Sequence, residues 1–566
     1  MVRYCALACD YDGTLASEGR AGAEALDALR RLRESGRKLI LVTGRLLPDL
    51  RELLAPLDLF DRIVAENGAV LYHPATREER QLAEPPPAEF LSTLVGRGVA
   101  PLESGRVIVA TARPHETTVL AAIRDLGLEL QVIFNREAVM VLPSGVNKGT
   151  GLRAALGELG LSPHNAVGVG DAENDHGFLE LCECAVAVAD ALPSVRQRAH
   201  LVTGGENILG VAELAARILD DDLAGVVRRD VVLGRTLDDR EVTADASGEN
   251  ILIAGSSGGG KSTLASGFLE QLHDQEYQFC IVDPEGDFQG IASAAVIGDS
   301  QRAPAVREVM QLLETPTQSV AVNLLGVGLE HRPTFFAQLL AALLELRARS
   351  GRPHWLVIDE AHHLLPRERA DAQLTVPQSL QGILLITVHP EHVAPTILSS
   401  TDLAVIIGKT PRQTLAGFAA MRQVPVPPVP LPDLPMGEGL AWRPASGESP
   451  VQFRGVVPRG ERRRHRRKYA DGELPPERSF YFRGVDGKLN LRAQNLRIFL
   501  QVADGVDETT WRHHLDNGDV ARWLRDAIKD PELALQVAAL AQQQMSADTT
   551  RRQVRALIEE RYTEAG

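Results

Sequence analysis

Apolar residues occur along this chain in short runs that end at polar or acidic residues. The first run, Tyr4 to Cys9, leads directly into Asp10, Tyr11, Asp12 and Gly13. Later runs lead into Thr43 and Asp171. Such runs predict buried strands of a parallel sheet, and apolar residues at helical spacing from Ala21 to Ser35 predict a helix between the first two strands. The pattern therefore predicts a doubly wound α/β sheet whose ligand crevice lies at the carboxyl ends of its strands.

Two carboxylates follow the first strand. Asp10 and Asp12 are two residues apart, so their side chains can face the same substrate, while Gly13 lets the chain turn away. Two carboxylates this close repel each other unless a proton or a cation lies between them. Mg²⁺, which prefers oxygen ligands, is the cofactor that we expect here.

Three more stretches follow in order: LILVTGR with Thr43, VNKGTGL with Lys148, and AVGVGDAENDHGFL with Asp171 and Asp175. Over roughly residues 1–220 this set resembles the haloacid dehalogenase (HAD) superfamily of phosphohydrolases. The stretch AENGAVLY, with Asn67 and Gly68, matches a hairpin of its Cof-like branch.

The resemblance implies a role for each motif residue. Asp10 would attack the phosphoryl group to form an aspartyl-phosphate, and Asp12 would act first as acid and then as base. Thr43 and Lys148 would hold the phosphoryl oxygens. Mg²⁺ would bind Asp10, the Asp12 backbone carbonyl and Asp171, with Asp175 orienting this set.

An insertion from about residue 76 to residue 144 matches the cap of the Cof-like branch, and its modest size is most similar to phosphoglycolate and sugar-phosphate phosphatases. Caps of this kind exclude water and contact the part of the substrate that is not phosphate. The cap residues that could do so are Arg113, His115, Asn135 and Arg136. Solvated surface is the alternative interpretation for each of them.

A second motif begins after the apolar strand Ile251 to Ala254. The stretch GSSGGGKST fits the phosphate-binding pattern G-x-x-x-x-G-K-[ST], with a strand before it and a helix after it. We expect it to bind ATP, with Lys261 on the β and γ phosphates and Ser262 on Mg²⁺. The expected nucleotide-binding residues are Gly255, Gly258, Gly259, Gly260, Lys261, Ser262 and Thr263.

The strand of WLVIDEAHHLLP supplies the matching acids. Asp359 would hold Mg²⁺, and Glu360 would polarise the attacking water, so hydrolysis of ATP is expected. The interval from Lys261 to Asp359 leaves room for the other strands of a RecA-like sheet.

The stretches Phe279 to Phe288 and Ile383 to Thr410 resemble the HerA/FtsK group of ATPases, which includes hexameric DNA translocases. This resemblance implies a homo-oligomer, hexameric in that group. It also implies a γ-phosphate sensor, for which Thr387 and His389 stay open, and an arginine finger, for which the candidates are Arg332, Arg412 and Arg422.

Composition limits the partners. The 566 residues exceed a single core, and a net charge of −15 argues against a generally basic nucleic-acid coat. The basic run Arg462 to Lys468 could contact nucleic-acid phosphates, although a solvated linker is the alternative. Five cysteines without metal-finger spacing predict reduced core thiols in a cytoplasmic protein. No apolar stretch is long enough to span a membrane.

We therefore expect four regions: a HAD-like phosphohydrolase domain (1–222), a HerA/FtsK-like P-loop ATPase domain (223–457), a basic linker (458–475) and a mainly helical C-terminal module (476–566). In the last region, Leu491, Leu496, Phe499 and Leu500 are expected in one helix, with further helices around Trp511, Trp523 and Leu533.

The motifs favour a Mg²⁺-dependent phosphatase of a small phosphorylated substrate, joined to an ATPase module. The alternative is an ATP-driven nucleic-acid translocase or defence-type assembly, in which the HAD domain removes phosphate from nucleotides or polynucleotide ends. A nucleotide-gated scaffold with weak catalysis is a third possibility.

Overall fold

The structure is a computed structural model. It describes residues 3–54, 57–135, 137–226, 229–256, 259–288, 291–367, 380–427, 434–459, 469, 474, 476–485, 487, 489–528, 530–543 and 545–562. The chain divides into two compact units, Met1–Gln289 with Ser293–Val456, and Gly290–Ala292 with Val457–Gly566.

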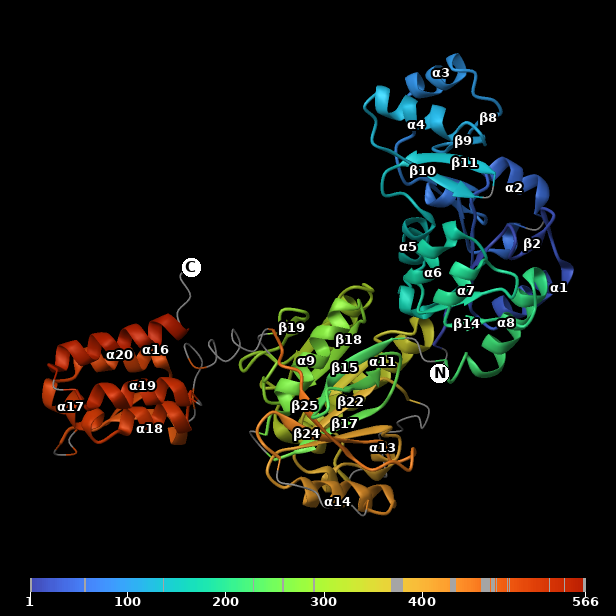
Figure 1. Ribbon diagram of the computed structural model, residues 1–566. Coiled ribbons are helices and arrows are strands. Elements are labelled where there is room, and N and C mark those ends of the chain that lie inside the picture. The colour runs from blue at the N-terminus through green and yellow to red at the C-terminus, as the bar shows by residue number, and fades with distance from the viewer. Residues whose placement is uncertain are drawn as a thin grey trace. The chain divides into compact units, whose positions relative to one another are not determined.

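In the part of the chain that the structure describes, the first sheet of unit 1 has eight strands (Figure 1). Their order is β14 (Leu201–Val202), β13 (Cys184–Ala187), β12 (Ala166–Gly170), β1 (Ala6–Asp10), β4 (Lys38–Val42), β5 (Arg62–Ala65), β6 (Val70–His73) and β7 (Glu78–Gln81). The strands from β14 to β5 are parallel, and β6 and β7 extend the sheet antiparallel. The central strand β1 is buried along its whole length, as its apolar run predicts.

Helices and short elements complete this domain. They are β2 (Ala16–Ser17), β3 (Arg20–Ala21), α1 (Ala23–Glu34), α2 (Leu47–Leu53), η1 (Leu57–Leu59), η2 (Glu66–Gly68), α5 (Lys148–Glu158), η3 (Pro163–Asn165), η4 (Glu173–Asp175), α6 (His176–Leu181), α7 (Pro193–Arg198) and α8 (Asn207–Asp221). The predicted first helix forms as α1, and its buried face contains Leu29 and Leu32.

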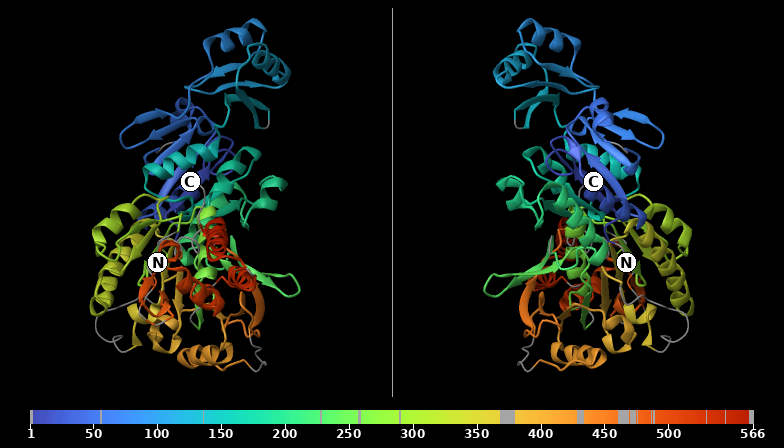
Figure 2. Two further views of the ribbon diagram at one scale, coloured as in Figure 1. Left: turned by 90° about the vertical axis from the view of Figure 1, so that its left-hand side faces the viewer. Right: turned by 90° about the vertical axis from the view of Figure 1, so that its right-hand side faces the viewer.

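A separate four-stranded sheet forms a cap. Its strand order is β10 (Leu130–Asn135), β11 (Ala138–Pro143), β9 (Val109–Ala112) and β8 (Leu102–Ser104), and α3 (Ala88–Gly96) and α4 (Glu116–Asp125) accompany it. Phe90, Leu94 and Val119 pack with its strands in a core of their own. Both views of Figure 2 show the cap at one end of unit 1, beyond the strands of the eight-stranded sheet.

Further along the chain, the described residues of unit 1 form an eleven-stranded sheet. Its order is β16 (Glu241–Asp245), β15 (Asp230–Thr236), β25 (Val451–Gly455), β24 (Glu438–Trp442), β23 (Leu403–Ile407), β17 (Ile251–Gly255), β22 (Ile383–Thr387), β21 (Trp355–Ile358), β18 (Phe279–Asp283), β20 (Val320–Asn323) and β19 (Ala295–Ile297). The strands from β23 to β19 are parallel. Around it lie α9 (Lys261–Asp274), α10 (Val306–Leu313), η5 (Leu329–His331), α11 (Arg332–Ser350), α12 (Ala361–Leu364), η7 (Pro390–His392), α13 (Pro395–Leu398) and α14 (Pro411–Arg422).

Unit 2 is mainly helical. It contains η8 (Pro476–Arg478), β26 (Phe480–Phe482), β27 (Leu491–Ala493), α16 (Leu496–Gly505), α17 (Glu508–Asp516), α18 (Asp519–Asp526), α19 (Pro531–Ala541) and α20 (Ala547–Tyr562). Its core contains Phe499, Trp511 and Trp523. The prediction for Leu491 was wrong, because this residue pairs in β27 with Phe482 and is 43% exposed, whereas Leu496 begins the helix.

The structure thus confirms the predicted α/β class, with a parallel-sheet domain and cap, a P-loop-type sheet and a helical C-terminal region. Within the described ranges, no helix combines the length and apolar character that crossing a bilayer requires.

Candidate active sites

A buried lysine joins two of the predicted acids at the carboxyl end of β1. Asp10 is the last residue of β1, and Lys148 is the first residue of α5. Lys148 Nζ donates to Oδ1 of Asp10 and to Oδ1 of Asp175, each at 2.6 Å. The side chain of Asn147 caps α5 by accepting from the Thr150 N–H, and this cap defines where the lysine enters the site.

The acidic loop after β12 is held by its own carboxylate. Oδ2 of Asp175 accepts hydrogen bonds from the backbone N–H groups of Asp171 and Ala172, both at 2.9 Å. Thr14 Oγ1 donates to Oδ1 of Asp171 at 3.2 Å. Gly13 has φ +85°, and a Cβ atom there would lie 2.3 Å from Oδ2 of Asp171. Only glycine therefore allows the loop after β1 to approach Asp171 this closely.

Three carboxylates converge next to Lys148. One oxygen each from Asp10, Asp171 and Asp175 lies within 4.8 Å of the others, and all three residues are buried. Burial, followed by the charge of Asp175, raises the pKa of Asp10 well above its usual value, although Lys148 opposes this shift. Burial alone would lower the pKa of Lys148, but Asp10 and Asp175 outweigh it and raise that pKa. An all-oxygen set with more negative than positive charge fits a Mg²⁺ ion.

The side chain of Asp12 has a different partner. Arg45 Nε lies 3.0 and 2.8 Å from its two oxygens, and Arg45 Nη2 lies 2.7 Å from Oδ1. The hydrogen bond to Asp12 is the largest cause of the raised pKa of Arg45. The buried Thr43 hydroxyl accepts from the Arg45 N–H at 3.1 Å. Arg45 is not among the predicted site residues, and its only signal in the sequence is a cation two residues after Thr43.

The predicted hairpin carries a second residue that the sequence analysis missed. The turn η2 joins β5 to β6, and its Gly68 has φ +104° and would place a Cβ atom 1.9 Å from the Asn147 carbonyl oxygen. The buried carboxylate of Glu66 accepts from the backbone N–H groups of Arg106, Val107 and Ile108 at 2.9 to 3.0 Å. Glu66 therefore ties the chain that enters β9 of the cap to the strands of the main sheet.

The polar cap residues differ in their surroundings. Arg113 is exposed, with its guanidinium carbon 5.8 Å from the ring centre of Phe134. His115 precedes α4, and its Nε2 lies 2.9 Å from the Ala100 carbonyl oxygen. The side chain of Asn135 and all of Arg136 lie outside the described residues.

The phosphate-binding motif joins β17 to α9. Gly255 ends β17, Gly259 and Gly260 precede the helix, and Lys261 begins it, with Thr263 in its first turn. Lys261 Nζ donates to the carbonyl oxygen of Gly255 at 3.1 Å, so the ammonium group lies inside the loop. Ser262 Oγ lies 3.3 Å from Oδ2 of Asp287. Gly258 lies outside the described residues.

The acids after β21 face this motif. Burial raises the pKa of Asp359 well above its usual value, and the charges of Asp283 and Glu360 add to the shift. Burial also raises the pKa of Glu360, and the charge of Lys261 opposes that shift. Glu360 adopts φ 42°, a left-handed conformation that is unfavourable for a side chain of this kind and often marks a functional position.

The two sensor candidates have different environments. Thr387 is buried at the end of β22, and its hydroxyl contacts His362 Nδ1 at 3.0 Å and the His389 N–H at 3.1 Å. His362 Nδ1 also lies 3.4 Å from Oε2 of Glu360. The His389 ring is exposed, with Nδ1 3.1 Å from Glu391 Oε1. Thr387 is therefore the candidate that is connected to Glu360.

The three arginine-finger candidates differ in how deeply they are buried. Arg332 is buried and donates to the Val327 carbonyl oxygen, whereas Arg412 is exposed and Arg422 is half-buried in α14. The basic run Arg462 to Lys468 lies outside the described residues.

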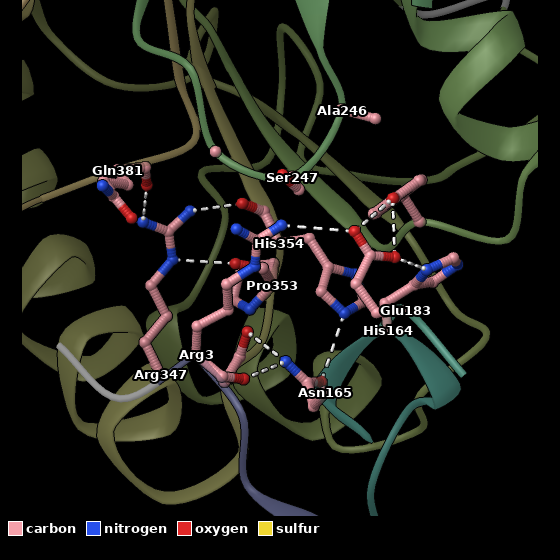
Figure 3. Close-up of a pocket in the computed structure, with 13 residues that line it drawn as sticks. Arg3, His164, Asn165, Glu183, Ala246, Ser247, Arg347, Pro353, His354 and Gln381 are labelled. Atoms are coloured by element: carbon pink, nitrogen blue, oxygen red, sulfur yellow. Dashed lines mark hydrogen bonds and ion pairs between the residues drawn. The ribbon is translucent and has the colours of Figure 1, made fainter. Parts of the chain in front are cut away.

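A buried polar cluster connects the domain of the eight-stranded sheet to the domain of the eleven-stranded sheet within unit 1 (Figure 3). Its centre is Glu183, which follows α6 and accepts from the Tyr277 hydroxyl at 2.8 and 2.9 Å. Arg3 Nη2 lies 3.2 Å from Glu183, and Nδ1 of His164 lies 2.7 Å from it. His164 Nε2 lies 2.7 Å from the carbonyl oxygen of Gln275, the C-cap of α9. Both His164 nitrogens thus face oxygen atoms, one of Glu183 and one of the Gln275 carbonyl.

These features define a parallel-sheet α/β domain with a buried cluster of carboxylates and one lysine at the carboxyl end of its strands, followed by a P-loop nucleotide-binding domain. The comparisons with known proteins agree. Residues 7–92 and 132–214 match the family model described as haloacid dehalogenase-like hydrolase, and residues 231–382 match the model described as AAA ATPase domain.

Relatives of the first domain are similar along nearly their whole length. A protein named phosphoglycolate phosphatase from Methanothermobacter thermautotrophicus is 32% identical over 222 residues, covering 38% of this chain and 98% of the relative. Another of that name from Haloarcula marismortui is 33% identical over 226 residues, covering 38% of this chain and 97% of the relative. A solved haloacid dehalogenase-like hydrolase from Bacteroides thetaiotaomicron is 19% identical, with a TM-score of 0.34 over 38% of this chain and 99% of its own.

The chain belongs to the haloacid dehalogenase-like hydrolases. It combines such a hydrolase domain with an AAA ATPase domain.

Proposed function

We propose that the first domain is a Mg²⁺-dependent phosphatase that hydrolyses a small phosphomonoester through an aspartyl-phosphate on Asp10. The observation that carries this proposal is the buried convergence of Asp10, Asp171 and Asp175 around Lys148. We also propose the domain boundaries 1–222, with a cap at about 76–144, then 223–457, 458–475 and 476–566.

The chemistry divides into two displacements. In the first, an oxygen of Asp10 bonds to phosphorus while the bond to the leaving alcohol breaks, and Asp12 donates a proton to that alcohol. In the second, Asp12 accepts a proton from water as the water oxygen attacks phosphorus and releases Asp10. Thr43 and Lys148 hold the phosphoryl oxygens. Arg45 contacts both oxygens of Asp12 and so holds this carboxylate in a fixed orientation.

Mg²⁺ would be held by the carboxylates of Asp10 and Asp171 and by the backbone carbonyl of Asp12, where it supplies positive charge to the transferring phosphoryl group. Asp175 would orient this set, because its Oδ2 already holds the N–H groups of Asp171 and Ala172.

The proposed substrate is phosphoglycolate or another small phosphorylated acid. The names of the relatives, and their similarity over almost their full length, support this choice. Arg113 and His115 are the described cap residues with the chemistry to bind a carboxylate.

For the second domain we propose a HerA/FtsK-like ATPase that works as a homo-oligomer. Lys261 would contact the β and γ phosphates, Ser262 and Asp359 would hold Mg²⁺, and Glu360 would polarise the attacking water. The Glu360–His362–Thr387 contacts support this assignment, because they connect the acid to the end of β22.

Paired variants test the two-site proposal. Asp10→Asn is expected to abolish phosphate release from phosphoglycolate and to leave ATP turnover intact, and Lys261→Ala is expected to do the reverse. Loss of the same activity in both variants would show that the chain has a single active site. Stimulation of ATP turnover by DNA, with a steep loss at higher salt, would instead favour the nucleic-acid translocase.

A further inference from the structure

A group of imidazole and carboxylate side chains lies outside both proposed active sites. The segment His389-Pro390-Glu391-His392 follows β22 and forms the turn η7. The His392 N–H donates to the His389 carbonyl oxygen at 3.1 Å, and the His389 N–H donates to Thr387 Oγ1, so the backbone of this turn is defined at both ends. Neither proposed reaction uses the side chains of His389, Glu391 or His392.

Their ligand atoms face one another. One ring nitrogen of His389, one of His392 and one oxygen of Glu391 lie within 4.8 Å of each other. The two imidazole rings have centres 5.0 Å apart, and His389 Nδ1 lies 3.1 Å from Glu391 Oε1. When four ligand atoms bind one ion tetrahedrally at about 2.1 Å, they lie about 3.4 Å from one another. The three ligand atoms here would therefore have to move closer together by about 1 Å to bind one ion. All three side chains are exposed and have room for such shifts.

The charges around the cluster suit a cation. Glu391 supplies the carboxylate of the cluster, and its Oε1 faces His389 Nδ1. His362 lies next to His389, with ring centres 5.6 Å apart.

We propose that His389, Glu391 and His392 form a binding site for a divalent transition metal ion, such as Zn²⁺. Two imidazoles and one carboxylate suit zinc and its neighbours, whereas Mg²⁺ prefers ligand sets made of oxygen alone, such as Asp10, Asp171 and Asp175. This site is distinct from both proposed Mg²⁺ sites. It lies at the end of β22, beside the Thr387–His362–Glu360 contacts of the ATPase domain.

Zinc binding to the untagged full-length chain tests the proposal. Excess Mg²⁺ is present to occupy the carboxylate sites, and a chromophoric chelator competes for zinc. The parent chain is expected to bind one equivalent of zinc at this site. The variants His389→Ala and His392→Ala are each expected to bind this zinc ion at least about tenfold more weakly. The control is His331→Ala, an exposed histidine whose Nε2 lies 3.4 Å from Glu330 Oε1, and it is expected to match the parent. Equal zinc affinity in the parent and in both test variants would overturn the proposal.

A spectroscopic measurement identifies the ligands directly. Cu²⁺ at one equivalent, in the same excess of Mg²⁺, is expected to show electron paramagnetic resonance couplings to two imidazole nitrogens in the parent and to one in either variant. A spectrum without nitrogen coupling, or one that neither substitution changes, would refute the site.

Discussion

Substitution of Glu183 tests the buried cluster that connects the domains of the eight-stranded and the eleven-stranded sheets of unit 1. Glu183 is fully buried and contacts Arg3, His164 and Tyr277. Burial alone would raise its pKa, but the hydrogen bond and charge of His164, the charge of Arg3 and the Tyr277 hydroxyl outweigh burial and lower this pKa from 4.5 to about 2. A shift of this size corresponds to a free-energy contribution on the order of 3 kcal/mol.

The variant Glu183→Gln removes the charge and keeps the size of the side chain. Because it leaves Arg3 and His164 facing a neutral group, we expect the free energy of unfolding of unit 1 to fall by about 3 kcal/mol at pH 7. Urea unfolding followed by tryptophan fluorescence measures this change, because Trp355 and Trp442 are both buried in this unit. The control Glu180→Gln, in the exposed pair with Arg198, is expected to change stability by less than about 1 kcal/mol.

The pH dependence checks the physical cause. Since the folded pKa of Glu183 lies below its ordinary value, the ionised carboxylate stabilises the fold fully above pH 4.5, and this contribution is lost as the pH falls toward 2. The difference between the parent and Glu183→Gln should therefore be constant from pH 7 to pH 6 and smaller by about 1 kcal/mol at pH 4. A difference independent of pH, or a control as damaging as the variant, would refute the reasoning.

Three further predictions concern the hydrolase domain. Glu66→Ala removes the acceptor of three backbone N–H groups and should destabilise the cap connection by about 2 kcal/mol. Amide hydrogen exchange at residues 106–108 should therefore become faster, and unchanged exchange would contradict the role of Glu66. Gly13→Ala forces a Cβ atom against Asp171 and should abolish phosphate release while ATP turnover persists, whereas Gly36→Ala, with open space around its Cβ position, should retain phosphate release. Arg45→Ala frees Asp12 and should lower kcat for phosphate release by up to about 100-fold. Arg45→Lys should not restore this activity, because lysine lacks the planar fork that holds both carboxylate oxygens. A fully active Arg45→Lys variant would show that charge alone is sufficient.

Local pattern and motif spacing were sufficient for much of this protein. Buried strands such as β1, β12 and β17 follow from continuous apolar runs, and the acids or glycines that follow them lie at the carboxyl edge because all parallel strands end there. Asp10, Lys148, Asp171 and Asp175 come together because Asp10 ends β1, Lys148 begins α5, and Asp171 and Asp175 lie in the loop after β12. Apolar periodicity was not sufficient for Leu491, because a strand of three residues is too short to be distinguished from a helix by its pattern.

Only the tertiary structure could pair residues that no local pattern relates. Arg45 binds Asp12 across 33 positions, Glu66 holds the cap segment 40 to 42 positions away, and Glu183 meets Tyr277 across 94 positions. The physical reason is that strand order and helix packing bring these side chains together, while each one by itself is an ordinary charged residue in a loop or turn. The sequence thus determined the elements and the chemistry at their ends, and the packing of those elements decided which charges share a buried site.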